Sequence, residues 1–227
     1  YILPDYNVYI KKGCEFLELP APKDLDEALD GLLILYSHVP SITTFPVYIG
    51  RLDMLLDPFI TDEEQDYIKI KRFLNHVDKT VPDSFCHANI GPYDTKAGRL
   101  ILKAVIELEA PTPNMTIRYD KSKTSREFAE LAAKACLLVS KPSFANDAYY
   151  ISDLGEQYGI ASCYNALPEC GGAYTLTRLR LGTIARACKT VDEMVNELLP
   201  RVAKCALSTM DKRHKFVVEE SNFFNTS

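Results

Sequence analysis

The sequence predicts an α/β fold with mainly parallel strands. Strand-like and helix-like segments alternate over most of the 227 residues, which is the pattern of repeated β-α units. The apolar content of 47% and the charged content of 25% are typical of a globular protein with a sizeable core. No repeat or linker divides the chain, so we expect residues 1–227 to form a single domain. Roughly five strands are predicted, enough for one open sheet or half of a barrel.

Helices are predicted where apolar residues recur at helical spacing after capping residues. In the first helix Asp24 is a suitable N-cap, and Glu27 follows three residues later. Thr61 opens the second helix with a similar pattern, and Thr124 forms a cap with Glu127 in a later one. The predicted helices span residues 24–38, 61–79, 94–109, 124–139, 148–158 and 191–213.

Strands are predicted between these helices, where β-branched and aromatic residues gather. Pro46 indicates that the first is an edge strand or starts irregularly. Residues 142–147 are predicted to be a strand end or a loop. The predicted strands span residues 43–49, 84–90, 114–119 and 173–181.

Composition excludes several classes of function. A net charge of −5 gives no electrostatic basis for binding nucleic acid. No apolar run approaches the roughly 18–20 residues that span a bilayer, and we find no signal peptide. We therefore expect contact with neither nucleic acid nor a membrane.

The cysteines indicate the compartment. They number seven, an odd count, lie far apart and form no Cys-x-x-Cys pair. This usage argues against a disulfide framework and a zinc site, and it favours a reducing cytoplasm. The chain begins at Tyr1 without an initiator methionine and stops soon after a charged segment. We expect a cytoplasmic protein that binds no metal, and a piece of a larger chain.

Cys163 is the candidate for chemistry, in a kinked segment of small residues from Ile160 to Gly172. Pro168 restricts the backbone there, and the glycine pair frees it. Three interpretations stay open. Cys163 can be a small buried hydrophobic residue. It can be a thiolate nucleophile, which needs a nearby base or cation, although Glu169 is the nearest charge in sequence. It can also relay hydrogen atoms, which requires an enclosed loop tip and no base.

Three motifs connect this cysteine with a known family. In chain order they are Pro113-Asn-Met-Thr-Ile-Arg118-Tyr, Lys141-Pro-Ser-Phe-Ala-Asn146-Asp147 and Ile160-Ala-Ser-Cys163. Their order and spacing resemble the central part of the glycyl radical enzymes, the family of pyruvate formate-lyase and the anaerobic ribonucleotide reductase. Over nearly all of its residues the chain looks most similar to the YjjI-type branch of that family.

The resemblance implies a fold and a type of reaction. The fold is a ten-stranded α/β barrel made of two five-stranded halves with helices outside, and this chain would supply about one half. Cys163 would become a thiyl radical and abstract a hydrogen atom from a small oxygenated metabolite in anaerobic metabolism.

The resemblance also implies a cofactor and partners. A glycyl radical, installed by an activating enzyme that uses S-adenosylmethionine and an iron–sulfur cluster, would oxidise Cys163. The family carries that glycine in an Arg-Val-x-Gly-aromatic motif, which none of the ten glycines here matches. We therefore expect this fragment alone to be inactive. The implied partners are the small-molecule substrate, the activating enzyme, the remaining part of the barrel and a second copy in a homodimer.

The resemblance suggests further residues for contact with the substrate. Asn146 and Asp147 either contact it or cap the next helix. Arg118 either binds an anionic group or forms a salt bridge inside the barrel wall. His87 faces the interior in one of its two registers. Asn165 stands where many dehydratases of the family have a glutamate, and since an amide cannot accept a proton at neutral pH, it argues against diol dehydration by that route.

Two residues and one other function stay open. Glu169 could replace the missing base, and Cys170 could be a second redox thiol. The alternative function is a non-catalytic α/β domain that binds a ligand or a partner, with Cys163 packed in its core.

Overall fold

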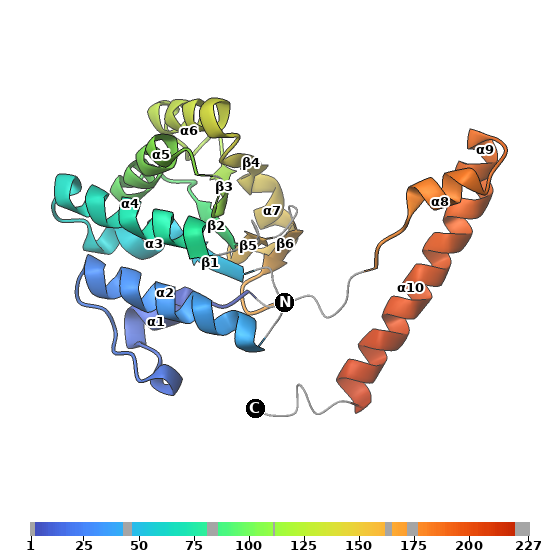
Figure 1. Cartoon of the computed structure of the whole chain (residues 1–227), viewed down its shortest axis with the longest axis horizontal. Helices are drawn as coiled ribbons and strands as arrows, with labels where there is room; N and C mark the ends of the chain where they lie inside the picture. The colour runs from blue at the N-terminus through green and yellow to red at the C-terminus, as the bar shows by residue number, and fades with distance from the viewer. Residues whose placement is uncertain are drawn as a thin grey trace. The chain divides into compact units, whose positions relative to one another are not determined.

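The computed structural model describes residues 3–42, 47–80, 86–110, 112–161, 165–171 and 177–220. The chain divides into two compact units, residues 1–172 and residues 173–227 (Figure 1). Each unit is described by itself below. That residues 1–227 form a single domain stays a prediction.

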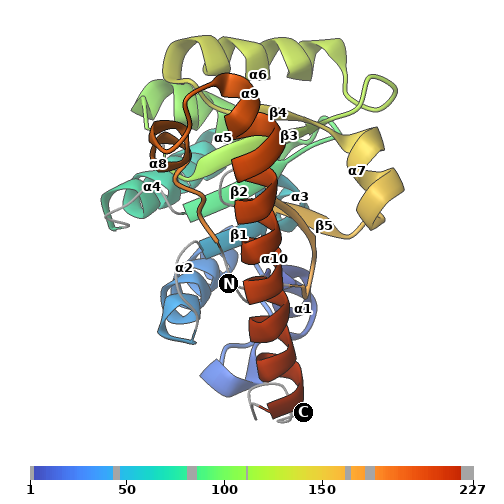
Figure 2. The same cartoon turned by 90° about the vertical axis from the view of Figure 1, so that its right-hand side faces the viewer.

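A parallel four-stranded sheet lies at the centre of the first unit. Its strands are β1 (Val47–Arg51), β2 (Cys86–Ile90), β3 (Asn114–Tyr119) and β4 (Ser143–Asn146). They lie side by side in chain order, as Figure 2 shows, and each neighbouring pair is parallel. The prediction of mainly parallel strands is confirmed for this sheet.

The helices of the first unit precede, connect and follow these strands. They are α1 (Tyr6–Lys12), α2 (Leu25–Ile42), α3 (Leu52–Leu56), α4 (Glu63–Thr80), α5 (Lys96–Leu108), α6 (Arg126–Val139) and α7 (Asp147–Leu154). The predicted cap of α2 is confirmed, because the Asp24 carboxylate accepts a hydrogen bond from the Glu27 N–H at 2.9 Å. None of the helices in the described part of the chain is long and apolar enough to span a membrane.

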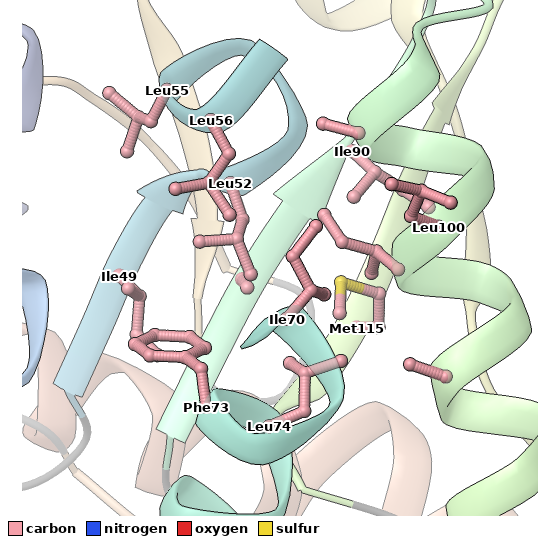
Figure 3. Close-up of a cluster of buried hydrophobic side chains, with 14 of the residues drawn as sticks. Ile49, Leu52, Leu55, Leu56, Ile70, Phe73, Leu74, Ile90, Leu100 and Met115 are labelled. Carbon is pink, nitrogen blue, oxygen red and sulfur yellow. The ribbon is translucent and has the colours of Figure 1, made fainter. Parts of the chain in front are cut away.

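The main core fills one face of the sheet. Alternate strand residues such as Ile49, Ile90 and Met115 pack there against side chains of α3, α4 and α5 (Figure 3). Burial of each leucine, isoleucine or phenylalanine in this cluster contributes about 1.5–3 kcal/mol. The helices that connect β1 to β4 all pack on this face, and the strand order never reverses. Such single winding is typical of α/β barrels, whereas a doubly wound sheet carries helices on both faces.

A hairpin follows the sheet. Strands β5 (Tyr158–Ala161) and β6 (Asn165–Pro168) pair antiparallel, with Ile160 opposite Ala166 and Ala161 opposite Asn165. Residues 148–158 were predicted to be one helix, which is wrong beyond Leu154. The helix ends there because Gly155 takes a φ of 83° and donates its N–H to the Ile151 carbonyl.

Most of the described residues of the second unit are helical. It contains α8 (Leu181–Arg186), α9 (Val191–Glu193) and α10 (Leu199–Lys215), with π-helical segments at Met194–Leu198 and Phe216–Glu220. The predicted helix 191–213 is confirmed. The predicted strand 173–181 is wrong for residues 177–181, because a strand needs a paired neighbour and none of the described residues supplies one.

One other prediction needs correction, and another is tested only in part. Ser125, not Thr124, caps α6, since the Ser125 hydroxyl accepts a hydrogen bond from the Phe128 N–H at 3.1 Å. The Thr124 hydroxyl instead accepts from the Asp120 N–H at 3.1 Å and closes the preceding turn. The first strand begins at Val47, and the predicted start at residues 43–46 lies outside the described residues.

Candidate functional site

The face of the sheet opposite the main core carries polar side chains. They alternate with the core residues along β1, β2 and β3, as strand geometry requires. The hairpin of β5 and β6 packs against this face, where Leu3, Tyr48 and Ala161 form a small apolar cluster of their own. The polar residues on it are Tyr48, His87, Asn89, Thr116 and Arg118.

Asn89 forms two hydrogen bonds with the main chain of a single residue of β5, Ile160. Its Nδ2 donates to the Ile160 carbonyl at 2.9 Å, and its Oδ1 accepts from the Ile160 N–H at 2.7 Å. The Tyr48 hydroxyl donates to the same Oδ1 at 3.2 Å. Asn89 is fully buried. Its amide provides the hydrogen-bond partners that a neighbouring strand would otherwise give to the N–H and the carbonyl of Ile160.

Tyr48 also requires a glycine in β5. A methyl group added to Gly159 would lie 2.5 Å from Tyr48 Cζ and 2.8 Å from Leu3 Cδ2, closer than carbon atoms can approach. The small residue lets the hairpin approach the sheet closely. Burial raises the pKa of the Tyr48 phenol, which therefore stays protonated and able to donate.

Arg118 and Asp147 form a buried ion pair at the other end of β5. Arg118 Nε donates to Asp147 Oδ1 at 2.7 Å, and their side chains are 2% and 0% exposed. The guanidinium also donates to the carbonyls of Tyr158 at 3.2 Å and Glu156 at 3.3 Å. Of the two fates predicted for Arg118, the structure places it in the salt bridge.

Tyr158 completes this cluster. Its hydroxyl donates to Asp147 Oδ1 at 2.8 Å, and its ring centroid lies 3.8 Å from Arg118 Cζ, in cation–π contact. Lys123 Nζ lies 3.5 Å from Asp147 Oδ2, an oxygen that accepts no hydrogen bond from any described residue. Because burial raises the pKa of the Tyr158 phenol, this residue is a permanent hydrogen-bond donor to the carboxylate.

His87 lies on the polar face, as one of its two predicted registers required. It is 5% exposed, and its Nε2 has no hydrogen-bond partner among the described residues. Burial, reinforced by the positive charge of Lys141, lowers its pKa to about 4. His87 is therefore neutral at pH 7.

Asp53 is a second buried titratable group beside the sheet. Its Oδ2 accepts from the Gly91 N–H at 2.8 Å and lies 3.4 Å from the Thr95 hydroxyl, while its Oδ1 has no hydrogen-bond partner in the described part of the chain. Burial raises its pKa to about 6, because the hydrogen bonds offset only part of the cost of removing the charge from water.

The other predicted residues lie near the hairpin and its preceding helix. Asn146 caps α7, since its Oδ1 accepts from the Tyr149 N–H at 3.2 Å. Glu169 follows β6 and is half-buried, and burial with the nearby charge of Asp5 raises its pKa. Cys170 is exposed and has a φ of 62°. That Asn146 and Asp147 contact a substrate stays a prediction.

Cys163 lies outside the described residues, which also exclude the side chain of Asn165. In sequence it stands midway between Ala161 and Asn165, the pair that closes the described ladder of β5 and β6. The described residues bring together no group of histidine, cysteine and acidic side chains that could hold a metal ion.

Sequence patterns missed Asn89, Tyr48 and Asp53. The one available signal was an amide side chain inside the strand Cys86–Ile90, all of whose residues are buried. Buried polar groups require partners, so Asn89 could have been identified as an anchor, although not its partner.

Known proteins provide the remaining comparison. The sequence matches the family described as "Glycyl radical enzyme YjjI-like" over residues 1–227. It is 93% identical over 227 residues to an "Uncharacterized protein" of Haemophilus influenzae, and 44% identical over 230 residues to "Uncharacterized protein YjjI" of Escherichia coli. The whole chain is covered in both matches but only 44% and 45% of these relatives, so it spans less than half of their length. No solved structure matches significantly. Since the family match covers every residue, the chain belongs to the YjjI-like family of glycyl radical enzymes.

Proposed function

We propose that Cys163 is the radical-bearing residue of a glycyl radical enzyme to which this chain contributes one part. The observation that carries the proposal is the anchored hairpin. Its two strands lead to and from residues 162–164, and Asn89 and Arg118 hold its first strand against the polar face of the sheet. A thiol that relays hydrogen atoms needs a fixed position, and these bonds fix the described strand that leads to Cys163.

The proposed chemistry moves one hydrogen atom at a time. Cys163 donates its thiol hydrogen atom to the glycine radical, so an S–H bond breaks, a C–H bond forms and the unpaired electron passes to sulfur. Cys163 then abstracts a hydrogen atom from a C–H bond of a small oxygenated metabolite, and its S–H bond is restored. The glycine lies outside this chain, because none of the ten glycines has the family's motif.

The fold is proposed to be about one half of the ten-stranded barrel. The singly wound sheet, with its connecting helices on one face and the hairpin on the other, supports this arrangement. The remaining half, a second copy in a homodimer and the activating enzyme are the proposed protein partners. The protein is proposed to act in the cytoplasm under anaerobic conditions.

Substrate contact is best supported for His87. Its unpartnered Nε2 faces the side of the sheet on which the hairpin lies and can bind a hydroxyl or carbonyl group. Arg118 and Asp147 already bind one another and the main chain of the hairpin, which favours a supporting role for both. Asn165 cannot act as a base, and the raised pKa of Glu169 makes that residue the better candidate for proton transfer.

The test uses the intact protein, activated anaerobically in D₂O by its activating enzyme. Rapid solvent exchange places deuterium on the Cys163 thiol, and repeated transfer to and from the glycine leaves deuterium on the glycine Cα. The doublet of the glycine radical in electron paramagnetic resonance then collapses. We expect this collapse in the unaltered protein and a persistent doublet in Cys163→Ala. Collapse at the same rate in Cys163→Ala would refute the role of Cys163 and favour a packed cysteine in a binding domain.

A further inference from the structure

We infer that Asn89, together with Tyr48, is a positioning residue. It sets where the hairpin of β5 and β6, which carries Cys163 in sequence, lies relative to the reaction partners of that cysteine. The inference rests on the proposed function of Cys163. It adds to that function a residue on β2, 74 positions away in sequence, that acts on the cysteine only through the main chain of β5.

The contacts identify the main chain as the target. Asn89 binds the N–H and the carbonyl of one residue, Ile160, and among the described residues it makes no hydrogen bond to a side chain of the hairpin. With the hydroxyl of Tyr48 on its Oδ1, both acceptor positions of that oxygen are used. The amide therefore has a single favourable orientation, and Tyr48 fixes it.

Position along the hairpin separates Asn89 from the other anchors. Arg118 binds the carbonyls of Glu156 and Tyr158, at the start of β5. Asn89 binds Ile160, which precedes Cys163 by three residues and lies next to the last described pair of the ladder. Among the hydrogen bonds between described residues of the sheet and the hairpin, those of Asn89 are closest in sequence to the cysteine.

Burial makes this contact stiff. Asn89 is 0% and Ile160 2% exposed, so water cannot replace the amide if β5 shifts. The close packing of Gly159 on Tyr48 prevents movement toward the sheet. Movement away from it breaks two buried hydrogen bonds at once. The hairpin thus has one well-defined depth on the sheet.

Hydrogen-atom transfer is sensitive to that depth. The reacting atoms must approach to about 3–3.5 Å, and a displacement of about 1 Å can slow such a step by about 100-fold. Loss of the Asn89 contact should therefore slow transfer between Cys163 and the glycine while leaving the formation of the glycine radical unchanged.

The experiment measures how fast the doublet of the radical collapses in D₂O, in the activated intact protein. Asn89→Ala removes both bonds to Ile160, and Asn89→Asp removes only the donor. In Asn89→Ala and Asn89→Asp we expect the doublet to collapse at least tenfold more slowly than in the unaltered protein. The initial doublet should be of equal size in all three proteins. Leu74→Ala, which creates a cavity in the main core on the other face of the sheet, is the matched control. Its doublet should collapse at the rate of the unaltered protein.

Amide exchange tests the contact without any substitution. In the unaltered protein before activation, the Ile160 N–H should exchange at least 100-fold more slowly than a free amide. Two results would overturn the inference and leave the role of Cys163 intact. One is a rate of doublet collapse in both Asn89 variants within twofold of that in the unaltered protein, and the other is a rapidly exchanging Ile160 N–H. Absence of collapse in the unaltered protein would instead refute the proposed function itself.

Discussion

Replacing Asp147 with alanine should destabilise the chain more than any surface substitution. The carboxylate accepts hydrogen bonds from Arg118 Nε at 2.7 Å and from the Tyr158 hydroxyl at 2.8 Å, and all three side chains are buried. Asp147→Ala leaves a guanidinium that is 2% exposed without its counter-charge. Breaking a buried pair in this way costs about 3–5 kcal/mol, so we expect a loss of about 4 kcal/mol.

The surface offers a matched control of the same geometry. Arg126 Nε lies 2.7 Å from Glu130 Oε1 on α6, but these side chains are 87% and 63% exposed. Because water screens such a pair, Glu130→Ala should cost less than about 1 kcal/mol. The two substitutions break ion pairs of equal length, so any difference between them reports the effect of burial.

Urea unfolding followed by far-ultraviolet circular dichroism measures both free energies, since the chain has no tryptophan for fluorescence. At about 2–4 °C per kcal/mol, Asp147→Ala should also lower Tm by about 8–16 °C. Asp147→Asn retains an acceptor for Arg118 and should fall between the two variants. A loss for Asp147→Ala within about 1 kcal/mol of the loss for Glu130→Ala would refute the reasoning from burial.

Three further substitutions test other buried positions of the first unit. The folded pKa of His87, about 4, lies below its usual 6.5, so stability should fall as the pH drops through that window. His87→Gln should remove this loss of about 3 kcal/mol. The folded pKa of Asp53, about 6, lies above its usual 3.8, so stability should fall as the pH rises between these values, and Asp53→Asn should remove that loss. Gly159→Ala should cost about 1–3 kcal/mol, because its methyl group would collide with Tyr48.

Controls separate these effects from one another. The pH windows of His87 and Asp53 overlap with opposite slopes, so each is read as the difference between variant and unaltered chain in urea midpoints from pH 4 to 7. If the urea midpoint changes with pH equally in the unaltered chain and in the His87 variant, His87 titrates normally. The same comparison with the Asp53 variant applies to Asp53. Gly182→Ala, on the exposed helix α8 with only an arginine tip within 4 Å, should stabilise instead of destabilise.

Sequence patterns predicted the elements that local residues determine. Strand β3 has the predicted bounds 114–119, and α6 ends at Val139 as predicted. Caps and apolar spacing are properties of a few neighbouring residues, so they can be identified without the fold. The end of α7 was missed because Gly155, which stops that helix, lies inside a segment with a continuing apolar pattern.

The hairpin could not be predicted because distant residues stabilise it. Each of its strands has four residues, too few for a clear alternation. The bonds that hold β5 on the sheet come from Asn89, 71 residues from Ile160, and from Arg118, 40 residues from Tyr158. No local pattern indicates such contacts. The motifs identified Arg118 and Asp147 separately as candidates for substrate contact, and only the fold shows that they bind each other.

The anchors of the hairpin explain how chemistry and stability can be separated in this fold. Asn89 and Arg118 bind main-chain atoms of Glu156, Tyr158 and Ile160, none of which belongs to residues 162–164. A substitution of Cys163 leaves every one of these bonds in place, so Cys163→Ala should keep the slow exchange of the Ile160 N–H. A packed cysteine, as in a pure binding domain, would instead contribute to the hairpin's stability, and its removal would speed that exchange. Amide exchange in Cys163→Ala therefore distinguishes the two functions before any substrate is known.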